Sequence, residues 1–339
     1  MRGVAILAVM LFHADAPFMK GGFIGVDIFF VLSGFLITAL LIREYDRDNN
    51  VNFKHFYMRR VLRLAPALIF LLLVFSIFSV FLLEEAKARS NLIDSLIALF
   101  YASNWARALQ IHPPDFLGHT WALSIEAQFY VVWPLTFWLL LRNVKSKENI
   151  FLIVLSLAFF SWFLRLYLAV NGSSIMRLYN GLDTRGDALL IGCALAVPMQ
   201  SRLISVKIQY ALSHILKYAA PLSAIALISI GCTLDWGSMH MYYWLLFVIE
   251  VLAALLILDV FISKNGVLKR ILSQKLLVFV GSISYGLYLW HFPVYRLMQS
   301  YGLECMAVIT IGSAVTFLVA WGSYCFIERS FLQLNNKFL

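Results

Sequence analysis

The chain has 339 residues, of which 62% are hydrophobic and 13% are charged, with a formal net charge of +9. Soluble globular proteins are nearer half apolar and a quarter charged, so this chain has too little polar surface for a water-soluble fold. Long apolar runs recur from end to end, which makes the bilayer the solvent and excludes a soluble enzyme, a disordered chain and a nucleic-acid partner.

Hydropathy predicts an all-α, polytopic membrane bundle of about ten transmembrane helices, forming one domain over residues 1–339. In chain order, the predicted spans are 3–18, 22–42, 64–83, 121–141, 150–170, 184–200, 218–234, 241–262, 276–299 and 305–327. We expect no appended soluble domain and no internal repeat.

A shorter apolar stretch, 92–105, decides the topology. If it does not cross, most of the 27 Lys and Arg residues lie on the same side as the basic loop after the second span. Because cytoplasmic loops carry an excess of these residues, we predict cytoplasmic termini and a re-entrant or interfacial 92–105 segment. The outer loop 84–120 is then either part of a lid or substrate entrance, or an ordinary connection.

Ionisable side chains inside spans are candidate functional residues, because burying them in lipid is costly. Arg2 and His13 are eleven positions apart, which places them on one helical face about 16 Å apart, with Arg2 at the cytoplasmic interface. For His13 alone, a packing role is an equal alternative. Other candidates also lie at mid-depth or in the outer half: Asp27, Glu126, Arg165, Arg185, Asp187 and His291. We expect these residues either to pair in a pocket or to form a structural ion-pair network.

Three arginines, Arg59, Arg60 and Arg63, lie beside the cytoplasmic entrance of the third predicted span. Arg60 and Arg63 are spaced to share a helical face. Guanidinium groups bind phosphate bidentately, so the cluster could clamp a phosphorylated ligand. The alternative, favoured by composition alone, is a positive-inside signal that also contacts anionic lipid.

The sequence lacks the motifs of several common nucleotide-binding, metal-binding and hydrolase sites. The sequence has no Walker glycine loop, dinucleotide fingerprint, zinc-binding helix motif or Gly-x-Ser-x-Gly elbow, and we predict no metal site. Ser33-Gly34 is interpreted as close helix packing and not as a nucleophile.

Five blocks occur in an order that resembles the acyltransferase 3 family of bacterial integral-membrane O-acyltransferases. The resemblance covers nearly the whole chain. The blocks are Arg2 with His13, Gly25-Val26-Asp27-Ile28-Phe29-Phe30 with Ser33-Gly34-Phe35-Leu36-Ile37, Arg59-Arg60-Val61-Leu62-Arg63, His119-Thr120-Trp121 with Glu126 and Tyr130, and Ser284-Tyr285-Gly286-Leu287-Tyr288-Leu289-Trp290-His291.

This resemblance implies a multi-pass protein of the bacterial cytoplasmic (inner) membrane. It would transfer an acyl group, usually acetyl, from cytoplasmic acyl-CoA to a hydroxyl of a glycan or lipid-linked saccharide. Acceptors among relatives include lipopolysaccharide O-antigen, capsule or exopolysaccharide, and peptidoglycan. Acetyl-CoA would be a donor substrate, with no permanently bound cofactor. The implied catalytic residues are Arg2, His13, Asp27 and Glu126, the implied CoA-binding residues are Arg59, Arg60 and Arg63, and the implied substrate-binding residues are His119, Trp121, Arg185, Asp187 and His291.

The chemistry suggests roles for these residues. His13 would be the general base or would itself carry the acyl group as an acyl-imidazole, with Asp27 or Glu126 orienting its ring. Arg2 would anchor the donor, and the acyl group would travel either on a pantetheine arm that reaches through the protein or on a residue. The alternatives are a transporter or flippase for a glycolipid or small anionic solute, and a non-catalytic partner in a polysaccharide-export complex.

Two departures from the family pattern concern the chain ends. Relatives usually carry a polar stretch before the first arginine, whereas this chain begins Met1-Arg2. Many relatives also append a soluble serine-hydrolase-like domain, and we expect none in this chain, whose sequence runs to Leu339. We therefore expect any second transfer step to require a separate partner.

Overall fold

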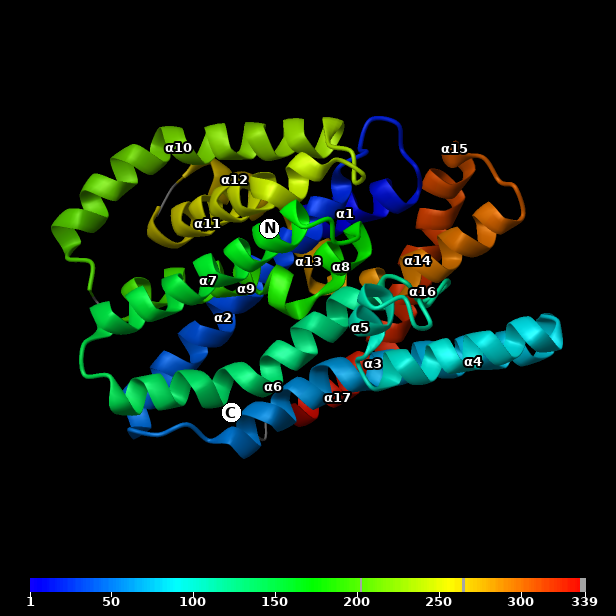
Figure 1. The fold of residues 1–339 in the computed structure, drawn as a ribbon, viewed down its shortest axis with the longest axis horizontal. Coiled ribbons are helices and arrows are strands. Elements are labelled where there is room, and N and C mark those ends of the chain that lie inside the picture. The colour runs from blue at the N-terminus through cyan, green and yellow to red at the C-terminus, as the bar shows by residue number, and fades with distance from the viewer. Residues whose placement is uncertain (202, 264–265, 336–339) are drawn as a thin grey trace.

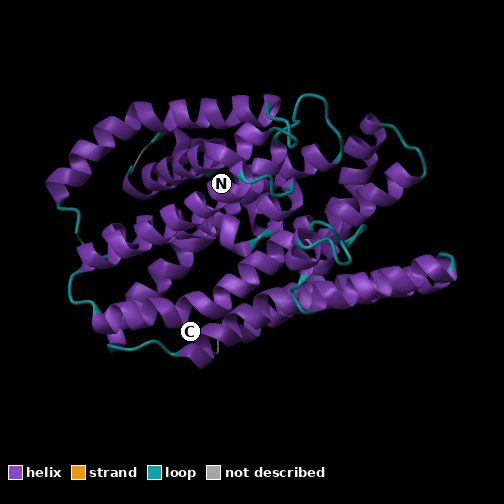
Figure 2. Cartoon of the chain, viewed as in Figure 1, coloured by secondary structure: helices purple, strands orange, loops and turns teal. Residues whose placement is uncertain are grey.

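The computed structural model describes residues 1–201, 203–263 and 266–335, and within these ranges every regular element is a helix (Figures 1 and 2). The α-helices are α1 (Arg2–His13), α2 (Gly25–Asp48), α3 (Phe53–Leu82), α4 (Glu85–Leu99), α5 (Ser103–Ala108), α6 (Thr120–Asn143), α7 (Lys147–Val170), α8 (Ile175–Asn180), α9 (Leu182–Gln200), α10 (Val206–Thr233), α11 (Leu246–Ile262), α12 (Val267–Leu272), α13 (Lys275–Ser282), α14 (Ser284–Ser300), α15 (Cys305–Ala307), α16 (Ser313–Ser323) and α17 (Arg329–Asn335). Short π-helical segments adjoin these helices: Met241–Leu245 precedes α11, Val308–Gly312 joins α15 to α16, and Tyr324–Glu328 joins α16 to α17.

The helical class is confirmed, whereas the count of ten spans is not. Within the described ranges, seven helices are long and apolar enough to cross a bilayer, and the bent pair α13–α14 would be an eighth. α1, which occupies the first predicted span, has 12 residues and so a length of about 18 Å, short of a hydrocarbon core of about 30 Å. α9 fills the sixth predicted span but is not among the seven.

Polar caps fix several helix ends in the loops. The Asn52 side chain accepts a hydrogen bond from the His55 backbone at 3.0 Å and starts α3 eleven residues before the predicted span. Ser146 caps α7 in the same way, through the Asn149 backbone at 3.2 Å. Because α3 begins this early, the Arg59–Arg63 segment lies inside its first three turns and has helical geometry.

The stretch 92–105 spans the end of α4, a turn and the start of α5. α4 packs back along α3 and is not among the candidate spans (Figure 1). This agrees with the expectation that 92–105 is not a full crossing. α5 then leads the chain toward the loop before α6, where it contacts α6 and α8.

Small residues bring the central helices into close contact. A Cβ atom on Gly34 of α2 would lie 1.9 Å from the Leu189 carbonyl oxygen of α9, and one on Gly192 of α9 would lie 1.9 Å from the Val31 oxygen. Gly3 of α1 meets α13 similarly, with 2.4 Å to the Leu277 oxygen. The interpretation of Gly34 as a packing residue is therefore confirmed.

α1 is placed at the centre of the molecule by these contacts. Its first turn packs on α13 through Gly3, and Gly25 at the start of α2 lies against the Ala5 carbonyl. α14 leaves α13 at a bend of 70° and also packs on α1. Arg2 and His13 consequently lie at opposite ends of one short, surrounded helix, as their spacing predicted.

Candidate active site

An arginine-rich cavity lies at the Arg2 end of α1. It is lined by residues of α1, α2, α3, α6 and α14, has an empty volume of about 620 Å³, and its polar walls are Arg2, Ser33, Arg60, Arg63, Glu126, Tyr130, Ser284, Tyr285 and Tyr288. Three guanidinium groups therefore face one carboxylate. We call this space the arginine cavity. Its surplus of positive charge suits an anionic ligand.

A wider mouth continues from the arginine cavity, with an empty volume of about 1130 Å³. The mouth and the cavity share Arg2, Ser33, Arg60, Arg63 and Tyr130, and the mouth adds Arg43, Arg47 and Arg59. Six arginines thus surround one continuous opening. Arg59 forms a salt bridge with Glu44 at 3.5 Å, so it supports the rim more than the cavity itself.

Arg60 is held in place by aromatic rings. Its guanidinium carbon lies 5.0 Å from the Tyr130 ring centroid and 5.6 Å from that of Phe56. Stacking of this kind holds a guanidinium group without using its N–H donors, which stay available to a ligand.

Glu126 belongs to the arginine cavity and not to the vicinity of His13. Its Oε1 atom accepts hydrogen bonds from the Ser33 hydroxyl and the Tyr130 hydroxyl. Asp27 is occupied by Arg185, with 2.6 Å between Oδ1 and Nη2. The prediction that one of these two carboxylates orients the His13 ring is wrong: among the described residues, Nδ1 of His13 has His291 as its partner, with Nε2 of His291 at 3.0 Å.

A second cavity lies at the His13 end of α1, with an empty volume of about 760 Å³. Its polar lining includes His13, Arg107, His119, Trp121, Tyr179 and Tyr288. We call it the histidine cavity. His13 and Arg107 also line an adjoining, more open hollow with Asp15, Asp115 and Arg296.

Two further histidines lie near His13, of which His291 contacts it directly. His291 of α14 is fully buried, and its Nε2 lies 3.0 Å from Nδ1 of His13. His119, which precedes α6, places Nε2 3.1 Å from the Leu289 carbonyl oxygen and leaves a buried Nδ1 without a hydrogen-bond partner. The predicted grouping of His13 with His291 is confirmed by this contact, and His119 lines the same cavity as His13.

The segment 84–120 forms a wall of the histidine cavity. Arg107, Pro114, Asp115 and Gly118 from this segment line it or the adjoining hollow. The segment is anchored by Asp94, which contacts His112 at 2.9 Å and accepts from the Asp115 backbone at 3.1 Å. Burial raises the pKa of the Asp94 carboxyl, and these two hydrogen bonds oppose the rise. Of the two interpretations of this loop, the structure favours an entrance.

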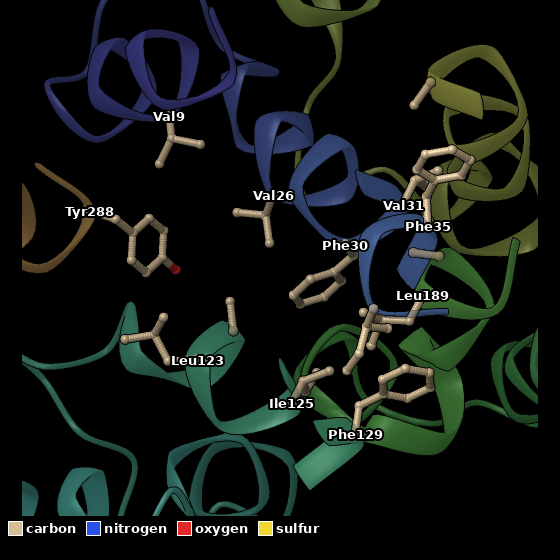
Figure 3. Close-up of a cluster of buried hydrophobic side chains, with 14 of the residues drawn as sticks. Val9, Val26, Phe30, Val31, Phe35, Leu123, Ile125, Phe129, Leu189 and Tyr288 are labelled. Atoms are coloured by element: carbon tan, nitrogen blue, oxygen red, sulfur yellow. The ribbon is translucent and has the colours of Figure 1, made fainter. Parts of the chain in front are cut away.

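The two cavities adjoin each other at Val26 and Tyr288, which line both. Figure 3 shows Val26 of α2 and Tyr288 of α14 facing the same space, with Val9 and Leu123 nearby. The Tyr288 hydroxyl donates to the His119 carbonyl oxygen at 2.7 Å, which fixes its position. A thin partition thus separates the arginine cavity from the histidine cavity.

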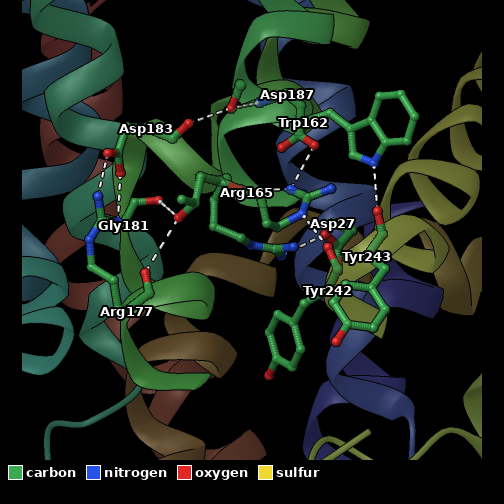
Figure 4. A network of polar contacts seen from close by, with 12 residues as sticks. Asp27, Trp162, Arg165, Arg177, Gly181, Asp183, Asp187, Tyr242 and Tyr243 are labelled. Carbon is green, nitrogen blue, oxygen red and sulfur yellow. Dashed lines mark hydrogen bonds and ion pairs between the residues drawn. The ribbon is translucent and has the colours of Figure 1, made fainter. Parts of the chain in front are cut away.

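The remaining charges form a closed cluster between α2, α7, α9 and α11 (Figure 4). Arg165 and Asp187 are 2.6 Å apart, as are Arg185 and Asp27, and all four are fully buried. Arg165 also donates to the backbone oxygens of Thr184 and Tyr242. We call these residues, with the buried Glu250 of α11, the ion-pair cluster.

The ion-pair cluster corrects one prediction. Arg185 and Asp187 were expected to bind substrate, yet neither lines either cavity, and their charged ends contact Asp27 and Arg165. The expected pairing is confirmed, but it occurs outside the pocket. Arg185 reaches the histidine cavity only through the rings of Trp121 and Tyr179, 6.0 and 5.1 Å from its guanidinium carbon.

Several lining residues were not predicted from sequence. Arg107 lies in the last turn of the short helix α5, outside every predicted span, so no membrane-burial argument selected it. Arg43 and Arg47 are one helical turn apart at the end of α2, a spacing that could have suggested a shared rim. Tyr288 belongs to the Ser284–His291 block but was given no role of its own.

Comparison with known proteins assigns this architecture to a family. The family model described as "Acyltransferase domain" matches residues 1–325, and the chain belongs to this family. OatA of Listeria monocytogenes, named as a peptidoglycan O-acetyltransferase, is 34% identical over 97% of this chain and 54% of its own length. YrhL of Bacillus subtilis, provisionally named for the same activity, is 35% identical over 97% of this chain and 53% of its own length.

A Staphylococcus aureus protein provisionally named as an O-acetyltransferase is 33% identical over the whole of this chain and 57% of its own length. The chain therefore spans about half the length of the curated relatives it matches. No solved structure matches it.

Proposed function

We propose that this chain transfers an acetyl group from acetyl-CoA to a hydroxyl of peptidoglycan or of its lipid-linked precursor. The observation that carries the proposal is the pair of adjoining cavities with different chemistry: one lined by arginines, the other by histidines, with Val26 and Tyr288 between them. The acceptor class follows from the names of relatives at 34–35% identity.

Arginine chemistry supports an acyl-CoA donor. Coenzyme A carries three phosphate groups, and six arginines surround the arginine cavity and its mouth. Arg2, Arg60 and Arg63 form no salt bridge with a carboxylate in the described part of the chain, so their charge is available to phosphate. The positive-inside rule places this mouth on the cytoplasmic side, where acyl-CoA is made.

The acceptor would bind at the histidine cavity. His13 takes the proton of the sugar hydroxyl, and the resulting oxygen attacks the thioester carbonyl. Arg107 would stabilise the oxyanion, because among the described residues its Nη2 has only the thioether sulfur of Met176 as a partner, at 3.9 Å. The C–S bond then breaks, and the thiolate leaves as the thiol with the proton from His13.

The pantetheine arm would cross the partition. With CoA phosphates at the arginines, the arm extends along α1 and passes between Val26 and Tyr288 to present its thioester near His13. Reach by the donor requires no covalent intermediate on the protein, and so we favour it over an acyl group handed on by a residue.

The test uses inside-out membrane vesicles containing the full chain, with radiolabelled acetyl-CoA added outside. We expect label in the lipid-linked saccharide and peptidoglycan fractions. The His13→Ala variant should lose about 100-fold or more of the transfer rate, because a general base contributes about that much. His240→Ala is the matched control, since His240 is exposed and lines neither cavity.

Two results would contradict the proposal. Full transfer by the His13→Ala variant would remove His13 from the reaction. Wild-type vesicles that bind acetyl-CoA yet leave both glycan fractions unlabelled would exclude this acceptor class. Saccharide movement across the membrane without acetyl-CoA would favour a transporter.

A further inference from the structure

The contact between His13 and His291 indicates which nitrogen of each ring carries a proton. A neutral imidazole ring has one N–H donor and one acceptor nitrogen. Nδ1 of His291 lies 3.0 Å from the Leu287 carbonyl oxygen, one turn earlier on α14, and Nε2 of His291 lies 3.0 Å from Nδ1 of His13. These two contacts together determine which nitrogens carry protons.

The direction of the hydrogen bonds that link His13, His291 and Leu287 follows from the Leu287 carbonyl oxygen at the end of the series. A carbonyl oxygen only accepts, so Nδ1 of His291 must be the N–H of that ring. Nε2 of His291 is then the acceptor, and Nδ1 of His13 must donate to it. Nε2 of His13 is left with a lone pair and no proton.

The burial of the two rings shows which end of this hydrogen-bonded series faces the histidine cavity. His291 is fully buried and lines neither cavity, whereas His13 lines the histidine cavity. Nδ1 of His13 therefore faces the protein, and the opposite edge of the ring, with Nε2, faces the space where an acceptor would bind. The Phe292 ring packs on His13 at 4.8 Å between centroids and limits its rotation.

We propose that His291 is the positioning residue for His13. It holds His13 in the tautomer whose Nε2 can accept a proton, and its own lone pair stabilises the imidazolium formed when that proton arrives. A neutral histidine thus takes the part that a carboxylate plays in an Asp–His pair. The proposal deepens the proposed function and rests on it for its catalytic consequence, whereas the tautomer of His13 does not depend on any activity.

The primary experiment is nitrogen NMR on the full chain in lipid, with ¹⁵N-labelled histidine. The His13 signals are identified as those absent from the His13→Ala variant. We expect a protonated Nδ1 and an unprotonated Nε2 on His13 in the wild type. In His291→Leu this acceptor is gone, the backbone of Val9 remains as a partner of His13, and we expect the unprotonated Nε2 signal to be reduced to a mixture.

Acetyl transfer by the same variants provides the second readout. We expect His291→Leu to lower the rate about 100-fold, within the range that a general base contributes. His291→Gln is the conservative variant, because its amide oxygen can accept from Nδ1 of His13. It should keep the wild-type tautomer and retain the rate to within about tenfold, a loss typical of altered supporting hydrogen bonds.

The outcomes separate the two proposals. A wild-type His13 protonated at Nε2 would overturn the tautomer assignment whatever the enzymatic activity. If the tautomer is as expected but folded His291→Leu transfers acetyl at the wild-type rate, the positioning role is overturned. If His291→Leu fails to fold, the test is His291→Gln. A loss of about 100-fold in the rate of the folded Gln variant, with an unchanged His13 tautomer, would also overturn the positioning role. Absence of acetyl transfer in the wild type would contradict the proposed function alone, because the tautomer is still measured.

Discussion

The ion-pair cluster and the arginine cavity both place charge inside the helical bundle, but their charges are arranged differently. In the cluster, each guanidinium group meets a carboxylate at 2.6 Å and the four side chains are fully buried. In the arginine cavity, three guanidinium groups face a single carboxylate, whose Oε1 accepts from two hydroxyls.

This difference separates structural charge from charge that can bind a ligand. Paired charges neutralise each other, whereas an unbalanced charge beside a cavity favours a counter-ion. Buried charge in a membrane protein is therefore not by itself evidence of a binding site. Variants that unbalance the cluster should affect folding, and variants that neutralise the cavity should affect binding.

The largest effect should come from unbalancing the cluster. Asp27→Ala leaves Arg185 fully buried without its carboxylate, and removing one partner of a buried pair costs about 3–5 kcal/mol. We expect a large fall in the thermal midpoint in detergent and little folded protein. The double variant Asp27→Ala/Arg185→Met should recover much of the loss, because both charges are then absent. A double variant no better than Asp27→Ala would contradict the pairing argument.

A smaller effect, on binding, should follow from neutralising the cavity. Arg60→Gln removes a charge that would contact phosphate, and a hydrogen bond to a charged group contributes about 1.5–3 kcal/mol. We expect CoA affinity to fall about 10- to 100-fold by calorimetry, with an unchanged thermal midpoint. Arg270→Gln is the matched control, since Arg270 is exposed and lies outside the cavity and its mouth. Equal affinity losses in both variants would indicate non-specific attraction.

The partition offers a third effect, on transfer alone. Val26→Phe adds bulk where the two cavities adjoin, so a pantetheine arm should pass less easily. We expect transfer to fall about tenfold, equivalent to about 1.4 kcal/mol, while CoA affinity stays the same. Val26→Ile is the control for added volume at a buried position. Unchanged transfer by folded Val26→Phe would contradict a path through this point.

The sequence predicted the helical class, the placement of Arg2 and His13 on one helix and a grouping of the buried charged residues, because periodicity and burial cost act locally along each helix. It did not predict which charges would meet. Asp27 and Arg185 are 158 positions apart, and only the packing of α2 on α9 brings them together. Arg107 could not be recognised either, because a residue of a short helix outside the predicted spans has no burial signal until the fold places it against a cavity.

The helix count was the least predictable feature. Hydropathy treats each apolar run as a straight crossing. α1 stops at His13 after 12 residues, and α13–α14 bends by 70° at Ser282–Ser284. Both departures depend on neighbours: α1 is surrounded by α2, α13 and α14, so it needs no lipid-spanning length of its own. The same departures bring His13 next to His291.

The smallest expected effect tests the charge balance of the cluster. Glu250 is fully buried, neither of its oxygens has a hydrogen-bond partner among the residues that the structure describes, and it lies within electrostatic range of both ion pairs. Two guanidinium groups already balance Asp27 and Asp187, so a third negative charge here would be uncompensated and costly. We therefore expect Glu250 to carry a proton.

Glu250→Gln should then be nearly neutral, because the amide replaces a neutral carboxyl group of the same shape. We expect a change in the free energy of unfolding below about 1 kcal/mol, within the range of mild substitutions. Asp187→Asn is the matched comparison, since it removes the carboxylate 2.6 Å from Arg165 and should destabilise the fold far more. Thermal unfolding of both variants in detergent measures the difference. Equal destabilisation would mean that Glu250 is ionised and that the cluster holds a net negative charge, which would make it a cation-binding region and end its contrast with the arginine cavity.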